Sequence, residues 1–171
     1  MLSLVVITLT KFTTKYAVKN TLELISKLSN VAVFKNCRLV AFGVSNLFGS
    51  VPIKELKTIL SGFLNKYPIR PKSQRELLNL LEICTFNNKF FQQKDGVPMG
   101  SPISPLLAEI FTSTFENKLF SSKNPPVNSI HFWARYVDDI ICIWKGGDRQ
   151  LTLLLDFLNF FYPTIKFTQE I

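Results

Sequence analysis

Residues 132–144 read Phe-Trp-Ala-Arg-Tyr-Val-Asp-Asp-Ile-Ile-Cys-Ile-Trp, so two adjacent carboxylates stand between runs of aromatic and β-branched residues. Both flanks have the composition of half-buried strands, and the pattern predicts a β-hairpin with Val137-Asp138-Asp139 as its tight turn. Side chains alternate along a strand, so the two carboxylates point the same way only if the turn redirects one of them. We expect Asp138 to face a working surface.

Two carboxylates at a hairpin tip repel each other unless a cation or hydrogen-bond donors compensate them. A hard divalent cation, Mg2+ or Mn2+, is the natural compensator, because such ions are held by one or two carboxylates together with substrate phosphates in two-metal phosphoryl-transfer sites. The alternative is an ordinary Asp-Asp turn, since Asp is common in turns for its local hydrogen bonding. The dipeptide alone favours the ordinary turn, and the rest of the chain has to decide.

Composition indicates one folded domain with a basic surface. The chain has 171 residues, of which 47% are hydrophobic, enough for a sizeable core. The formal net charge of +8 favours an anionic partner such as nucleic acid, although charge alone is weak evidence.

Cysteine usage and the first residues bear on location. Cys37, Cys84 and Cys142 lie far apart and His131 is the only histidine, which argues against a disulfide framework or a zinc site. Residues 1–10 are apolar but too short to span a bilayer, and they lack the basic start of a signal peptide. We interpret them as a core strand or a truncated remnant, and expect an intracellular protein of the nucleus or cytoplasm that is neither secreted nor membrane-bound.

Hydrophobic periodicity and breaker residues predict an α+β fold, an antiparallel sheet layered with helices. Helix starts are indicated by Ser50 before Pro52, by a Ser73-to-Glu76 capping box and by Ser104 before Pro105. The expected elements are a helix at 14–28, a strand at 38–44, a helix after Pro52, a leucine-rich helix from 73 to about 85, a short strand at 89–93, a helix from 104 to about 119, the hairpin, a helix at 151–161 and a strand at 164–168.

Two loops stand out between these elements. Residues 67–72 contain two prolines and carry basic side chains, and a solvated connection is the favoured interpretation. The loop Gly96–Ser101 holds two glycines just before the helix that begins at Ser104, and a plain loop before a helix would be its default interpretation.

Three segments, taken together and in this order, resemble the reverse transcriptases of Penelope-like retroelements. Residues 42–52 look like the first palm motif, and residues 91–111 with Phe115-Glu116 look like the long second motif, in which Met99 is typical of this branch. Residues 135–140, which contain Tyr136-Val137-Asp138-Asp139, match the third motif, and residues 159–170 resemble the segment that follows it. The likeness runs from about Lys19 to the end of the chain and implies a reverse-transcriptase palm.

The chain departs from this pattern at the centre of the chemistry. The first motif of the family carries a metal-binding Asp at the position that Gly43 holds here. Glycine has no side-chain ligand atom, and a two-metal site needs carboxylates from both strands to hold its cations about 4 Å apart. The resemblance therefore implies an enzyme family, whereas Gly43 predicts a degenerate ligand position and an inactive chain.

The resemblance also implies roles for individual residues. Asp138 and Asp139 would be the catalytic metal ligands, with the Val44 backbone carbonyl as a further metal contact. Phe48 would pack under the sugar of the incoming nucleotide, with core packing as the alternative. Lys166 would correspond to the lysine that reaches the triphosphate. The loop residues that would meet the template-nucleotide pair are Gly96, Pro98, Met99, Gly100 and Ser101.

The implied partners are an RNA template, a DNA primer or hybrid duplex, and a deoxynucleoside triphosphate, and the oligomeric state is left open. We expect residues 1–171 to form a partial reverse transcriptase domain, a palm whose fingers and thumb are largely missing. Two alternatives to a polymerase fragment stay open: a non-catalytic basic module that binds single strands or hybrid duplex, and a retroelement relic without selected function.

Overall fold

The computed structural model describes residues 12, 14–32, 35–86, 89–98 and 100–170, which form two compact units. Unit 1 contains Phe12, Thr14 and the described residues of 46–114, and unit 2 contains those of 15–45 and 115–170. Helix α6 (Ser104–Ser121) contributes its first part to unit 1 and its last part to unit 2.

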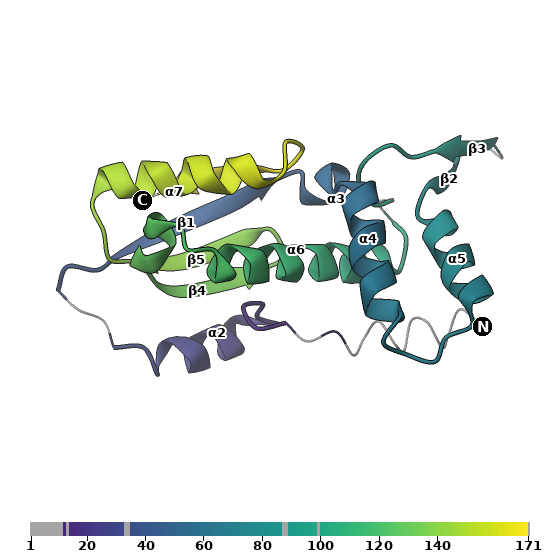
Figure 1. Ribbon diagram of the computed structural model, residues 1–171. Coiled ribbons are helices and arrows are strands. Elements are labelled where there is room, and N and C mark those ends of the chain that lie inside the picture. Colours follow the sequence, from purple (N-terminus) through teal and green to yellow (C-terminus); the bar gives the residue numbers. More distant parts are fainter. Residues whose placement is uncertain (1–11, 13, 33–34, 87–88, 99, 171) are drawn as a thin grey trace. The chain divides into compact units, whose positions relative to one another are not determined.

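Unit 2 is built on a four-stranded antiparallel sheet with strand order β4-β5-β1-β6. The strands are β1 (Arg38–Ser45), β4 (Ile130–Tyr136), β5 (Asp139–Trp144) and β6 (Lys166–Glu170). The expected hairpin is β4 and β5, joined at Val137-Asp138. Figure 1 shows three of these strands beside helix α7.

One face of this sheet is buried and the other is largely open. Val40 and Phe42 of β1 are at most 1% exposed. Leu39, the residue before Val40, points to the other face and is 63% exposed. Cys142, Trp144 and Trp133 lie in register with the buried set, and burial alternates along β1, whereas β4 and β5 each contain a run of three buried residues. The covered face fixes the register, because a slip of one residue would move all these side chains to the open face.

Helix α7 (Asp148–Phe161) and the end of α6 cover the buried face. Leu151, Leu154 and Leu158 of α7 are buried, as their helical spacing predicts. Phe115 of α6 stacks on Phe167 of β6 with ring centroids 5.3 Å apart, and Phe161 meets Phe115 edge-on at 5.2 Å. A 3-10 turn (Pro125–Ser129) leads from α6 into β4.

The first expected helix is shorter than its hydrophobic pattern suggested. It is α2 (Thr21–Leu28), capped by the Asn20 side chain, which accepts a hydrogen bond from the Glu23 amide. Ala17 lies before it in a parallel bridge to Arg135 of β4, and the Val18 amide donates to the Arg135 carbonyl at 2.8 Å. Pairing with the β4 edge competes with the helix, so residues 14–19 are not helical.

Unit 1 contains four helical segments and a β-hairpin among its described residues. Its helices are α3 (Leu47–Ser50), α4 (Ile53–Leu64), α5 (Pro71–Leu80) and the start of α6, and its strands are β2 (Ile83–Phe86) and β3 (Lys89–Gln92). The predicted caps at Ser50 and Ser73 are wrong. The N-cap residue is Pro52 in α4 and Arg70 in α5, and neither helix has a side-chain cap. Helix α5 begins at Pro71, because proline has the backbone φ that the first turn of a helix requires.

The predicted fold class is confirmed as mixed helices with an antiparallel sheet. The leucine-rich helix ends at Leu80 rather than near Thr85, because residues 83–86 pair with β3. The strand or remnant expected at residues 1–10 lies outside the described residues. Within the part of the chain that the structure describes, no helix is long and apolar enough to cross a bilayer.

Cys37 and Cys142 differ in burial. Cys142 on β5 is fully buried, and burial raises the pKa of its thiol to about 12. Cys37, before β1, is half-buried.

We predict that iodoacetamide at pH 8 modifies Cys37 and leaves Cys142 unmodified in the native protein, because the thiolate is the nucleophile. Peptide mass mapping with and without urea measures this, and modification of Cys142 at the rate of Cys37 would contradict the packing of β5.

Candidate functional site

A row of four residues crosses the open face of the unit 2 sheet. Tyr136 of β4 lies opposite Asp139 of β5, Asp139 lies opposite Gly43 of β1, and Gly43 lies opposite Thr168 of β6. Directly opposite residues of an antiparallel pair share a face, so this row brings the hairpin carboxylate Asp139 beside the position that Gly43 holds. The first strand therefore lies directly beside the hairpin tip.

The turn at the tip carries backbone strain. Val137 has φ of 56°, a left-handed conformation that a β-branched residue rarely adopts. Asp138 follows it, and its carbonyl accepts a hydrogen bond of 2.9 Å from the Val44 amide of β1. The turn is therefore tied to the first strand by the backbone, immediately next to Gly43.

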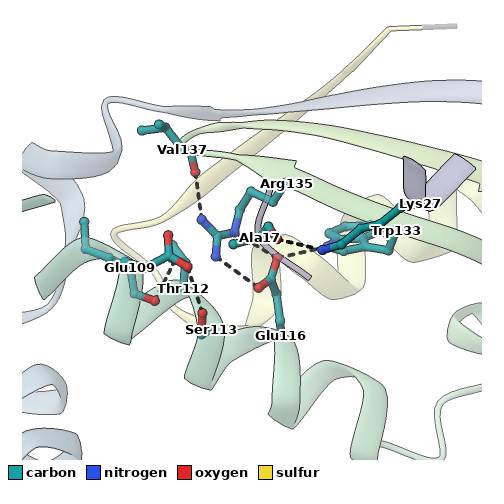
Figure 2. Close-up of polar contacts among 10 residues, drawn as sticks. Ala17, Lys27, Glu109, Thr112, Ser113, Glu116, Trp133, Arg135 and Val137 are labelled. Atoms are coloured by element: carbon teal, nitrogen blue, oxygen red, sulfur yellow. Dashed lines mark hydrogen bonds and ion pairs between the residues drawn. The ribbon is translucent and has the colours of Figure 1, made fainter. Parts of the chain in front are cut away.

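A buried ion pair under the hairpin supports this turn (Figure 2). Arg135 of β4 is 2% exposed and Glu116 of α6 is 1% exposed. The Arg135 Nε donates to Glu116 Oε1 at 2.8 Å and the Nη2 to Oε2 at 3.1 Å, a two-pronged contact. The indole Nε1 of Trp133 donates to Glu116 Oε1 at 3.0 Å.

The same arginine reaches the strained residue. Its Nη1 donates to the Val137 carbonyl at 3.1 Å, and Figure 2 shows the guanidinium between that carbonyl and the Glu116 carboxylate. The backbone of Arg135 is also engaged, since its amide donates to the Tyr16 carbonyl at 3.0 Å. Arg135 thus joins helix α6, strand β4 and the turn that carries Asp138.

The residues at the tip offer few ligands for a divalent cation. Asp138 and Asp139 are exposed, and neither carboxylate has a hydrogen-bond or ion-pair partner among the described residues. No group of three or more His, Cys, Asp or Glu side chains converges anywhere in residues 12, 14–32, 35–86, 89–98 and 100–170. Two carboxylates fit one hard cation that takes its other ligands from phosphates and water, and they do not fit a pair of cations.

Gly43 is the position where a side chain would lie beside Asp139 on the open face. A Cβ at position 43 would lie 3.2 Å from the Thr168 Oγ1. Apart from the residues next to Gly43 in the sequence, no other atom would lie within 4 Å of it. Thr168 is exposed, and its hydroxyl donates a long hydrogen bond of 3.4 Å to the Gly43 carbonyl. A side chain at position 43 therefore requires a small movement of one exposed hydroxyl.

Other predicted site residues of unit 2 lie on the same open face. Lys166 pairs with Ser45, two residues along β6 from Thr168, so it shares the face of Gly43 and is exposed. Asp139 and Tyr136 also line a pocket of about 390 Å³ with residues at the start of α2. The open face thus brings together Asp139, the Gly43 position and a lysine.

The predicted site residues of unit 1 form a separate group. Gly96 has φ of 82° and is buried, and a Cβ there would lie 2.8 Å from the Gly49 carbonyl oxygen. Its amide donates to the Val51 carbonyl, and the Val97 amide donates to the carbonyl of half-buried Phe48. Close approach to the chain's own backbone therefore accounts for glycine at 96, where we had expected approach to a template.

The rest of this loop is only partly described. Gly100 is exposed with φ of 88° and has open space where a Cβ would be. The Pro98 carbonyl accepts a 2.6 Å hydrogen bond from the Ser104 hydroxyl, and the Ser101 carbonyl accepts one from the Ser104 amide, so the loop is joined to the start of α6. Met99 lies outside the described residues.

Comparison of the sequence with protein-family models gives one match. The model of the reverse transcriptase (RNA-dependent DNA polymerase) family matches residues 8–163. The match covers most of the chain, including the strand with Gly43 and the whole Asp138-Asp139 hairpin. The chain therefore belongs to the reverse transcriptase family. None of the curated proteins compared with it matches.

Comparison of the structure finds the same fold in solved telomerases. An apo telomerase from Candida tropicalis, truncated from its C-terminal domain, has a TM-score of 0.68 at 16% identity over 98% of this chain and 39% of its own. The Candida tropicalis and Candida albicans telomerases in complex with a TWJ fragment of telomeric RNA have TM-scores of 0.64 and 0.60 at 17% and 11% identity. Each covers 91% of this chain, which spans 30% and 32% of their lengths.

Removing one partner of the buried pair Arg135–Glu116 should cost far more stability than removing one partner of a surface pair. Replacing Glu116 by Gln leaves a buried guanidinium uncompensated, and we predict a loss of about 3 to 5 kcal/mol in the free energy of unfolding. Glu82→Gln, which disrupts the partly exposed Lys57–Glu82 pair, should cost about 0 to 1 kcal/mol. Urea denaturation of both variants measures the difference.

A double variant separates charge compensation from packing. Arg135→Met with Glu116→Leu removes both charges together, so we expect it to be less destabilising than the sum of the single changes. Equal losses for Glu116→Gln and Glu82→Gln would contradict the assignment of Arg135–Glu116 as the dominant pair.

Proposed function

We propose that this chain is the palm of an RNA-directed DNA polymerase of Penelope-like type whose nucleotidyl-transfer site has lost one metal ligand. The proposal joins two observations: membership of the reverse transcriptase family, and the motif pattern of residues 42–52, 91–111 and 135–140. On this proposal the chain alone does not extend primers.

The observation that carries the proposal is the register of Gly43 opposite Asp139. A carboxylate at position 43 would share the open face with Asp139 and bring negative charge from a second strand, as a two-metal site requires. Glycine leaves only the adjacent Asp138 and Asp139. The backbone of the site is retained while the ligand set is incomplete.

The remaining residues have distinct parts in such a site. Asp138 and Asp139, with the Val44 carbonyl, would hold one Mg2+ or Mn2+, which supplies charge neutralisation for a phosphoryl group when bound. Lys166 would contact the triphosphate, and Phe48 would pack under the sugar. Pro98, Met99, Gly100 and Ser101 would meet the template-nucleotide pair, whereas Gly96 serves the loop itself. The partners would be an RNA template, a DNA primer and a deoxynucleoside triphosphate.

Non-catalytic binding of nucleic acid is the second candidate function. The net charge of +8 supports it, because contacts between cations and phosphates need no metal site. Solved telomerases with the same fold are in complex with a fragment of telomeric RNA. Nucleic-acid binding without nucleotidyl transfer would depend on the basic surface of this fold and would not require a carboxylate at position 43.

Restoring the carboxylate tests the proposed site. We predict that Gly43→Asp binds Mn2+ more tightly than the parent chain, because a carboxylate beside Asp139 raises cation affinity. Mn2+ should then raise the Tm of Gly43→Asp more than that of the parent, since a ligand that binds only the folded form stabilises it. Thermal denaturation with and without Mn2+ measures this. Primer extension by Gly43→Asp is not required for the prediction.

Gly43→Asn is the matched control. It has the shape of Asp and requires the same movement of Thr168, but it adds no charge, so its Tm should respond to Mn2+ like the parent. Equal Mn2+ responses of Gly43→Asp and Gly43→Asn would show that position 43 no longer takes part in a metal site. Primer extension by the parent chain itself would contradict the proposed loss of activity.

A further inference from the structure

Four basic residues lie in the connection between α4 and α5 and in the first half of α5. Lys66, Arg70, Lys72 and Arg75 are all exposed, and no acidic residue lies between Asn65 and Arg75. We call these four side chains the basic connection. They include the basic loop that the sequence led us to interpret as a solvated link.

The basic connection differs from the paired cations of the described residues in having no acidic partner. Lys27, Arg38, Lys57 and Arg135 each form an ion pair with a Glu or Asp. In the part of the chain that the structure describes, none of the four side chains of the basic connection makes an ion pair or hydrogen bond. Their positive charge is therefore available to a partner from outside the chain.

The backbone that carries these charges is held in place. Ile69 is 8% exposed, and its carbonyl accepts a hydrogen bond of 3.2 Å from the Gln74 side chain. The Tyr67 ring packs on Phe63 of α4 with centroids 5.2 Å apart. Prolines at 68 and 71 further restrict the backbone. A fixed backbone reduces the entropy that binding would cost.

The charges do not serve the stability of α5. Arg70 is its N-cap residue and Lys72 lies in its first turn, where the helix dipole disfavours cations, and that turn contains no acidic residue. Lys72 and Arg75 are three residues apart, so two like charges are neighbours on the helix surface. Glu76, four residues after Lys72, offsets part of this repulsion, and an anion bound near Arg70 and Lys72 would offset the unfavourable interaction with the helix dipole.

We propose that the basic connection is a binding surface for the phosphodiester backbone of RNA. Exposed Arg and Lys side chains contact phosphates without reading sequence, and four of them on one fixed segment fit a run of successive phosphates. The proposal rests on the proposed function, because it takes nucleic acid as the partner. It adds a surface of unit 1 to the residues already assigned there and needs neither Gly43 nor a metal.

The test compares salt dependence of RNA binding. Fluorescence anisotropy with a labelled 20-nucleotide oligouridylate is measured from low to moderate salt for the parent and for Lys66→Ala/Arg70→Ala/Lys72→Ala/Arg75→Ala. Each lost phosphate contact on a single strand lowers the slope of log K against log salt by about 0.7, so we expect the variant's slope to be shallower by about 3 and its binding weaker at every salt concentration.

The control variant removes the same number of charges elsewhere. Lys89→Ala/Lys94→Ala/Lys123→Ala/Arg149→Ala replaces four exposed cations outside the basic connection, and its slope should change by less than half as much. Since alanine at 72 and 75 favours the helix, the basic-connection variant should unfold at a Tm no lower than that of the parent.

Each result supports or overturns one proposal. RNA binding by the parent with equal slopes for the two variants would overturn the basic connection and leave the proposed function standing. Absence of RNA binding by the parent would overturn this proposal and the nucleic-acid partners of the proposed function, whereas the Mn2+ response of Gly43→Asp tests the metal site separately. A labelled polyglutamate peptide that depends on the basic connection as strongly as RNA would overturn the assignment to phosphates.

Discussion

The ion pair of Arg135 with Glu116 is the contact on which the hairpin tip depends. Its atoms are almost fully buried, so either charge alone would be expensive in this core. The guanidinium is satisfied by the carboxylate on one side and by the Val137 carbonyl on the other. Because Val137 is held at a positive φ that valine disfavours, the turn needs support from its surroundings, and Arg135 supplies it from beneath the sheet.

The sheet packs its core on one face and leaves the row that contains Gly43 on the other, which explains why the fold tolerates glycine at position 43. Register is fixed by Val40, Phe42 and their buried neighbours on the covered face. Gly43 belongs to the open row with Asp139 and Thr168, where a side chain contributes little to packing. Glycine weakens a strand slightly, but the loss is small beside the burial on the other face. The identity of the residue at position 43 is therefore largely independent of the packing that holds the sheet together.

The sequence predicted the sheet and the hairpin because their signals are local and strong. Runs of aromatic and β-branched residues on both sides of Asp138-Asp139, and the helical spacing of Leu151, Leu154 and Leu158, leave few other structures. Boundaries near prolines and edges were harder: Pro71 starts α5 ahead of the Ser73 capping box, and pairing of Ala17 with the β4 edge displaces the start of α2. The Arg135–Glu116 pair was missed altogether. A charged residue within an apolar strand and another within an apolar helix were its only signals, and their pairing depends on tertiary packing.

The cations of the described residues include two groups: those that pair with a carboxylate of the chain, and those that are exposed without such a partner. Paired cations such as Arg135 and Arg38 are committed to the chain's own carboxylates. Lys166 on the open face and the four residues of the basic connection are exposed, and within the described residues they have no such carboxylate. Nucleotidyl transfer needs carboxylates placed to within fractions of an ångström, whereas phosphate binding needs only positive charge on a fixed backbone. The proposed loss of nucleotidyl transfer at Gly43 would therefore leave the proposed phosphate binding unaffected, because the two depend on different residues.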